Sequence, residues 1–196
     1  QRSRARHRHR HAWTEPGGGG DEIDRTLDRR EFAGEDHEEV VIGSADTLFL
    51  ATAYPHEAAA GDEADASSHG VDVSHRGGRP GFVRIDGDDT LVVPDFNGNR
   101  FFNTLGNLAV HPRAGLLFVD FDSGDLLHVA ATAEIVWNGP EVDAFEGAER
   151  LVRFRLTHAL RRPGALPLRW GDAQLSPHLA GTGQWNTGMR PLADGR

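Results

Sequence analysis

Short runs of apolar residues, separated by turn-forming glycine, proline and aspartate, dominate the middle of the chain. Runs of about four to eight residues with this pattern are typical of β-strands. They predict strands at residues 47–54, 71–75, 89–94, 114–121, 126–137 and 151–160. We expect the first two to pair with each other. The runs on either side of Ser123-Gly124-Asp125 should form an antiparallel hairpin.

Two segments carry helical signals instead. The first begins near Glu35 and should carry the apolar residues 40–42 toward the core before a Gly-Ser-Ala-Asp sequence ends it. The second opens at Asn97-Gly98-Asn99-Arg100 and runs toward Val110, and Pro112 stops it. A helix start of this kind offers unpaired backbone N–H groups, which favour a bound phosphate.

About six strands in antiparallel hairpins, with few helices, favour a barrel over a sandwich. No segment alternates strands and helices as a parallel α/β fold does, and the glycine fingerprint of dinucleotide-binding folds is absent. The predicted fold class is therefore mainly β with minor α.

Composition divides the chain into three parts. Residues 1–35 form a basic and then acidic tail that we expect to be disordered. Residues 36–170 form the barrel domain, and residues 171–196 form an irregular C-terminal extension rich in proline and glycine. This extension is a candidate to wrap around a partner subunit.

Two charged segments leave alternatives open. The histidines and arginines of residues 2–11 allow a metal site or a nucleic-acid arm, although the glycine linker at 17–20 and the lack of preorganised geometry favour disorder. No spacing among the later histidines indicates a metal site. The acidic stretch at 57–70 is long for a hairpin connection and is interpreted as an expanded surface loop, with a lid as the alternative.

Composition also restricts the chemistry. The net charge of −9 argues against general nucleic-acid affinity, and no apolar run is long enough for a membrane span. Cysteine is absent, which excludes disulfides and thiolate chemistry and favours a cytoplasmic protein. The first ten residues hold no apolar stretch, so we expect no signal peptide. All the basic residues are arginine, which excludes a Schiff-base lysine and a Walker-type phosphate loop.

Three motifs in the central segment point to a family. His75-Arg76-Gly77-Gly78-Arg79-Pro80-Gly81-Phe82 is followed by Asp95-Phe96-Asn97-Gly98-Asn99-Arg100 and then by Gly106-Asn107-Leu108. These motifs resemble the pyridoxamine 5′-phosphate oxidase-like proteins, over about Ser44 to Trp170. The resemblance implies a six-stranded antiparallel split β-barrel of the FMN-binding type. It also implies a homodimer with the flavin at the interface, and an FMN-dependent oxidoreductase that acts on a small-molecule substrate or electron donor.

FMN requires cationic or backbone donors for its phosphate and a flat apolar slot for its ring. The resemblance assigns the phosphate to Arg76, Asn99, Arg100 and Thr104. The family's oxidases carry a lysine near the position of Thr104 and another where this chain has Arg79 to Arg84, so phosphate binding must shift to arginines and backbone groups. The full set of candidate cofactor-binding residues is Ser74, His75, Arg76, Gly77, Val93, Pro94, Asp95, Asn99, Arg100, Asn103, Thr104 and Trp170.

Individual roles and rival functions remain open at this point. His75 is the candidate catalytic residue, as a proton donor or hydrogen-bond partner of the flavin, and a structural barrel histidine is the alternative. Trp170 either caps the flavin ring or packs in the core. A barrel of the same fold that binds F420 or haem is one rival function. A flavin-binding or electron-carrier module without turnover is the other.

Overall fold

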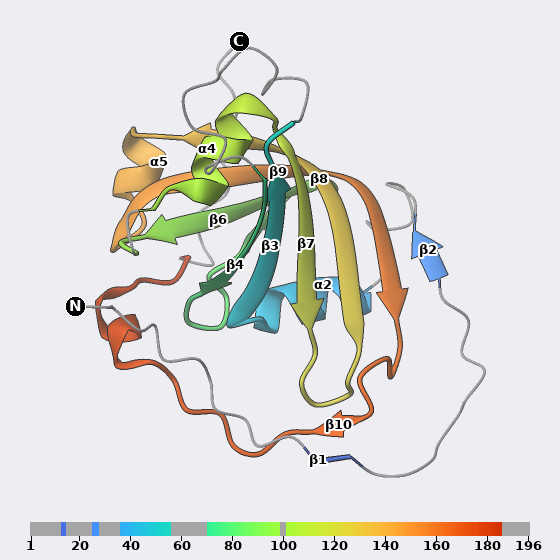
Figure 1. Cartoon of the computed structure of the whole chain (residues 1–196). Coiled ribbons are helices and arrows are strands. Elements are labelled where there is room, and N and C mark those ends of the chain that lie inside the picture. The colour runs from blue at the N-terminus through green and yellow to red at the C-terminus, as the bar shows by residue number, and fades with distance from the viewer. Residues whose placement is uncertain (1–12, 15–24, 28–35, 56–69, 99–100, 186–196) are drawn as a thin grey trace.

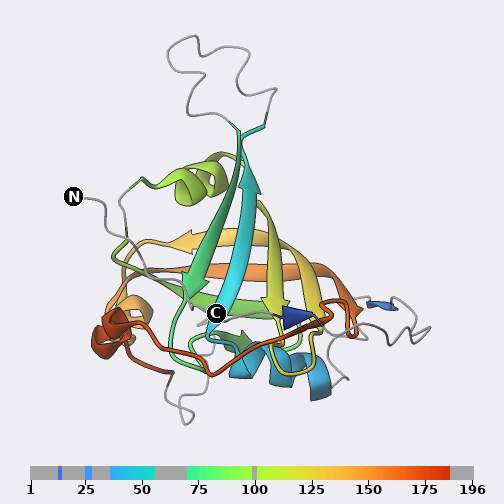
Figure 2. The same ribbon diagram turned by 60° about the horizontal axis from the view of Figure 1, so that its bottom comes forward.

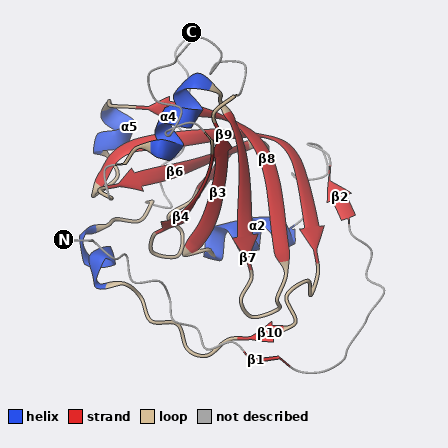
Figure 3. Ribbon diagram, in the orientation of Figure 1, coloured by secondary structure: helices blue, strands red, loops and turns tan. Residues whose placement is uncertain are grey.

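The computed structural model describes residues 13–14, 25–27, 36–55, 70–98 and 101–185. The strands are β1 (Trp13–Thr14), β2 (Arg25–Leu27), β3 (Thr47–Ala53), β4 (Val71–Gly77), β5 (Arg84–Asp86), β6 (Thr90–Phe96), β7 (Arg113–Val119), β8 (Leu126–Val136), β9 (Ala148–Arg162) and β10 (Leu168–Arg169). The helices are α2 (Asp36–Ser44), α4 (Asn103–Val110), α5 (Pro140–Asp143) and the 3-10 helix η2 (Pro177–Gly181) (Figure 3).

One curved antiparallel sheet forms the body of the molecule, which makes the fold mainly β and like a split barrel (Figure 1). Its strand order is β4-β3-β7-β8-β9-β6-β5, and β2 pairs with the C-terminal part of β9. The sheet curls so that its two ends face each other across the interior (Figure 2). The end strands β4 and β5 do not pair with each other in this strand path. The barrel is therefore open along one line, between β4 and the β6–β5 hairpin.

The core fills the inside of this curved sheet. Alternate residues of β3, β7, β8 and β9 are buried, as expected for strands with one face toward the interior and one toward solvent. The inward-facing side chains form one continuous cluster that includes the fully buried Leu48, Phe118, Leu127 and Phe154. Helix α2 contributes Ile42 to this cluster, and α4 contributes apolar side chains of its own.

The six strands predicted from the sequence correspond to β3, β4, β6, β7, β8 and β9. The predicted pairing of the first two is confirmed, with Phe49 opposite His75, and so is the β7–β8 hairpin. The structure adds β5, whose three residues are too few to show an alternating pattern. Inside the segment that we expected to be a disordered tail, it describes the short strands β1 and β2, which pair with β10 and β9.

Both predicted helices are present, with two corrections. In α2, Val41 and Ile42 are buried as predicted, but Val40 is 62% exposed because it lies on the outward side of the helix. The second helix, α4, begins at Asn103, so the predicted start at residues 97–100 was wrong. Phe102 adopts a left-handed backbone conformation (φ 54°), which prevents the helix from extending toward the preceding residues. No helix in the described ranges is long and apolar enough to cross a bilayer.

Two glycines provide a test of this packing. A Cβ at Gly78 would overlap the fully buried Phe82 side chain, whereas a Cβ at Gly106, within α4, would meet open space. We expect Gly78→Ala to lower the free energy of unfolding by roughly 1–3 kcal/mol because of overpacking. We expect Gly106→Ala to raise it by roughly 0.5–1 kcal/mol because alanine is the better helix former. Urea unfolding of both variants measures these changes. Equal changes in the free energy of unfolding would contradict the close packing of Gly78 against Phe82.

Candidate functional site

The opening of the barrel leads into a cavity of about 860 Å³. Its walls come from β4, the end of β6, the first turn of α4, the start of β9 and residues 174–182 of the C-terminal segment. Cavities of about 300–1,000 Å³ are typical of small-molecule sites. The cavity is therefore large enough for a ligand of cofactor size.

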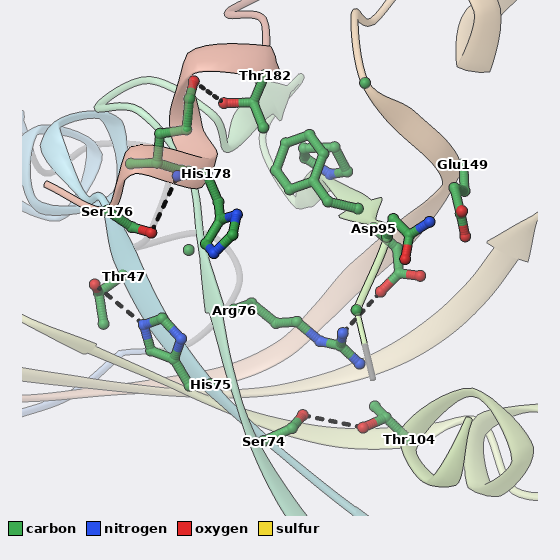
Figure 4. Close-up of a pocket in the computed structure, with 18 of the residues that line it drawn as sticks. Thr47, Ser74, His75, Arg76, Asp95, Thr104, Glu149, Ser176, His178 and Thr182 are labelled. Atoms are coloured by element: carbon green, nitrogen blue, oxygen red, sulfur yellow. Dashed lines mark hydrogen bonds and ion pairs between the residues drawn. The ribbon is translucent and has the colours of Figure 1, made fainter. Parts of the chain in front are cut away.

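Strand β4 presents its free edge to this cavity. It is the terminal strand of the sheet, so half of its backbone N–H and C=O groups point away from β3. Side chains from both faces of β4 line the cavity, with His75 on one side and Ser74 and Arg76 on the other (Figure 4). A flat ligand along this edge would have backbone hydrogen-bonding groups beside its rim.

A chain of short polar contacts attaches α4 to β4. The Thr104 hydroxyl donates to the Asp72 carboxylate (2.5 Å), and the hydroxyls of Ser74 and Thr104 lie 3.0 Å apart (Figure 4). One turn along the helix, the buried Asn107 amide donates to the Thr52 hydroxyl. These contacts fix the position of the α4 N-terminus relative to the edge of β4.

The α4 N-terminus itself faces the cavity. Its N-cap residue is Phe102, and no side chain of the described residues caps the helix. The first backbone N–H groups of a helix have no partner within it, and they favour an anion. The exposed aromatic ring of Phe101 stands beside them at the cavity. This end of the cavity thus combines anion-binding groups with aromatic surface.

The most strongly charged part of the site bridges the opening of the barrel. Arg76 on β4 donates from Nη1 to Oδ1 of Asp95 on β6 at 2.8 Å, and Nη1 of Arg150 on β9 lies 3.3 Å from Oδ2 (Figure 4). The pKa of Asp95 lies above its ordinary value: burial, the largest cause, raises it, Arg76 and Arg150 lower it, and nearby Glu149 raises it. Asp95 is thus a buried carboxylate held between two guanidinium groups.

His75 lies on the opposite side of β4 from this cluster. Its Nε2 is 3.4 Å from the Thr47 hydroxyl, and its ring meets Phe49 edge to face, with centroids 5.9 Å apart. These contacts hold the imidazole at the cavity wall without burying it. A titratable ring in this position can exchange a proton with a bound ligand.

The C-terminal segment forms the outer wall of the cavity. We call residues 171–185 the strap. Its short helix η2 is held by Arg79, whose Nε donates to the Leu179 carbonyl at 3.1 Å. Beyond η2, Gln184 donates to the Pro80 carbonyl and Trp185 to that of Phe82. The strap places His178 at the cavity, across from β4 (Figure 4).

The structure brings most of the candidate residues together. Eight line the main cavity: Ser74, His75, Arg76, Gly77, Pro94, Asp95, Asn103 and Thr104. Val93 is buried and borders a much smaller cavity beneath them. Trp170 is absent from the described lining and packs edge to face on Phe121 instead. Asn99 and Arg100 lie outside the described residues.

Sequence reasoning missed Arg150 and the strap. Arg150 stands in a strand where arginine alternates with apolar residues, a pattern that normally indicates a solvent-facing side. The strap carries no regular pattern apart from its prolines and glycines. No signal in either segment indicated the cavity, because both reach it through contacts between residues far apart in the chain.

Comparisons with known proteins give structural matches alone: no family model and no curated protein matches the sequence. The chain is similar to HupZ of Group A Streptococcus (13% identity, TM-score 0.47, covering 64% of this chain and 90% of that one). It is also similar to an FMN-binding protein from Syntrophomonas wolfei, with 15% identity and a TM-score of 0.46, covering 68% of this chain and 87% of that one. Another match is a Clostridium acetobutylicum protein of the pyridoxinephosphate oxidase family, related to a general stress protein. Its identity is 11% and its TM-score 0.43, and the match covers 74% of this chain and 96% of that one.

The seat of the strap can be tested at Gly147. This residue has a φ of +82°, and a Cβ there would overlap the backbone carbonyl of Gly181. We expect Gly147→Ala to displace η2, lower the free energy of unfolding by roughly 1–3 kcal/mol and speed amide exchange at residues 178–184. Gly87→Ala is the control, because Gly87 also has a positive φ (+61°) but a Cβ there meets open space. Unchanged exchange of the strap amides in Gly147→Ala would contradict the placement of the strap.

Proposed function

We propose that this protein binds FMN in the cavity beside β4 and acts as a flavin-dependent oxidoreductase of the pyridoxamine 5′-phosphate oxidase-like class on a small molecule. One observation carries the proposal. Of the three sequence segments that resemble this family, the start of the first (75–78) and the described part of the second (95–98) are separate in the chain but border the same cavity, whereas 106–108 do not line it. Such convergence is expected if both segments serve one ligand.

The described residues fit the requirements of FMN. Its phosphate requires donors and positive charge, which the uncapped start of α4 and the Arg76 guanidinium provide. Its ring requires hydrogen-bonding groups at the rim, and the free edge of β4 supplies them. Ser74 and Thr104 hydroxyls lie between these two regions, where a ribityl chain would pass.

When bound, the flavin supplies the hydride or electron transfer, and the protein positions the reactants. Arg76 and the α4 N-terminus orient the anionic end of the ligand. The strap shields the cavity from water on its outer side. His75 holds or releases a proton at Nε2, within reach of a group beside the β4 edge.

We also propose that the protein forms a homodimer through the outer face of β4, β3 and β7. Val71 and Val73 on β4 are 78% and 66% exposed, and they lie opposite Ala53 and Ala51 on β3. The next strand continues this face with Gly115, opposite Ala51. An exposed sheet face of small apolar side chains is suited to packing against a copy of itself. Because His75 lies on this same side of β4, a second copy here would sit next to the cavity.

The absorption spectrum of the freshly purified protein is the direct test of the cofactor. We expect flavin bands, and heat should release a compound with the mass of FMN. A Soret band would indicate that the site binds haem in place of FMN, and release of a deazaflavin would indicate that it binds F420. A colourless protein that also refuses added FMN would contradict the proposal.

Arg76→Gln tests the phosphate contact. Loss of one charge-assisted hydrogen bond should weaken FMN binding by roughly 10- to 100-fold while riboflavin, which lacks the phosphate, binds as before. Quenching of flavin fluorescence measures both affinities. Arg155→Gln is the matched control, since Arg155 is an exposed arginine on β9 away from the cavity lining. Equal losses for both flavins would place Arg76 outside the phosphate site.

Val71→Glu tests the dimer. Charge repulsion and desolvation should convert the dimer to a monomer in sedimentation velocity at micromolar protein. Val40→Glu introduces the same change at an exposed valine on α2 and should leave the dimer intact. Val71 does not line the described cavity, so a parallel loss of FMN affinity would place the site at the interface. A wild-type monomer would rule the dimer out.

A further inference from the structure

Two arginines from different strands converge on one buried carboxylate at the cavity. Arg76 contacts one oxygen of Asp95, and Arg150 contacts the other. We propose that Arg150 is a second cationic residue of a phosphate-monoester subsite, and that Asp95 is an internal counter-ion which the incoming phosphate displaces from Arg76. This inference rests on the proposed function for the identity of the ligand. The paired arginines themselves do not depend on it.

Arg150 is held in place before any ligand arrives. Its side chain is 11% exposed, and its guanidinium contacts the rings of Phe102 (5.1 Å to the centroid) and Trp137 (5.8 Å). Neighbouring Glu149 pairs with its Nη2. A guanidinium stacked on aromatic rings loses little freedom on binding, which favours a specific anion over a loose surface contact.

The carboxylate occupies the place that suits a phosphate. Its two oxygens each face one guanidinium, and phosphate oxygens match that fork geometry equally well. Arg76 is the more accessible of the two arginines, with 26% of its side chain exposed against 11% for Arg150. A phosphate entering from the cavity would therefore reach Arg76 first and displace Asp95 from it, and its remaining oxygens would then face the Arg150 guanidinium.

Displacement of Asp95 from Arg76 by a phosphate would change the pKa of Asp95. Among the described residues, the charged groups that face Asp95 are Arg76 on β4 and Arg150 and Glu149 on β9. Burial already raises the pKa of Asp95, with the two arginines opposing that shift. If a phosphate binds Arg76, Asp95 loses this guanidinium contact and gains a negative charge nearby, so its pKa rises further. Binding then takes up protons, and the Asp95 contribution to affinity weakens as the pH rises.

Two variants test this arrangement with FMN and riboflavin as probes. Arg150→Gln should weaken FMN binding by at least about tenfold and leave riboflavin binding within about twofold. Asp95→Asn should strengthen FMN binding, because the competing charge is gone. Its FMN affinity should also rise more with pH than that of the wild type, because the opposing contribution of Asp95 is lost. Arg155→Gln is again the control for loss of one positive charge on β9. Melting curves of each variant check that it folds.

Several outcomes would overturn the inference. One is an Arg150→Gln variant that binds FMN as the wild type does or loses both flavins equally. Another is an Asp95→Asn variant that binds FMN more weakly while folding normally. If wild-type protein binds neither flavin, the proposed function fails, and inorganic phosphate becomes the probe. A melting temperature that rises with phosphate in the wild type and in Arg155→Gln, but not in Arg150→Gln, would still support the subsite. No rise in the wild type would remove it.

Discussion

The ion pair between Arg76 and Asp95 joins the two ends of the sheet where no backbone ladder does so. Had β4 paired with β6, the backbone hydrogen bonds would have closed the barrel and left no room for a cavity. Removing a carboxylate and a guanidinium from water costs several kcal/mol, and their attraction offsets this cost incompletely. Such a pair stabilises the fold weakly, so its placement at a cavity is better explained by a role in binding.

The cavity exists because distant parts of the chain meet around that opening. The strap crosses in front of it and is held by the loop after β4, through Arg79 and the carbonyls of Pro80 and Phe82. Trp185, at the end of the strap, lies under the Arg84 guanidinium and meets Phe145 edge to face. The same loop that follows the cavity strand thus anchors the outer wall, which couples the position of the wall to the position of β4.

The sequence predicted the elements that depend on local patterns. Short apolar runs bounded by turn residues located β3, β7 and β8, and the Ser-Gly-Asp turn located the β7–β8 hairpin. It failed at the start of α4, because the helix boundary depends on the left-handed backbone of Phe102, a conformation that aromatic residues rarely adopt. It also failed to indicate Arg150, because the sequence does not show that the rings of Phe102 and Trp137 flank that side chain.

By itself, the sequence determined where the six longer strands lie and that its permanently charged basic side chains are all arginine, and it identified the motifs that resemble a flavin-binding family. Those properties follow from residue type and from periodicity over a few neighbours. The tertiary structure alone decided that Arg76 and Arg150 share Asp95, that Trp170 packs on Phe121, and that the strap lines the cavity. The physical reason is that these contacts depend on sheet curvature and strand order, which bring together residues that no local pattern relates.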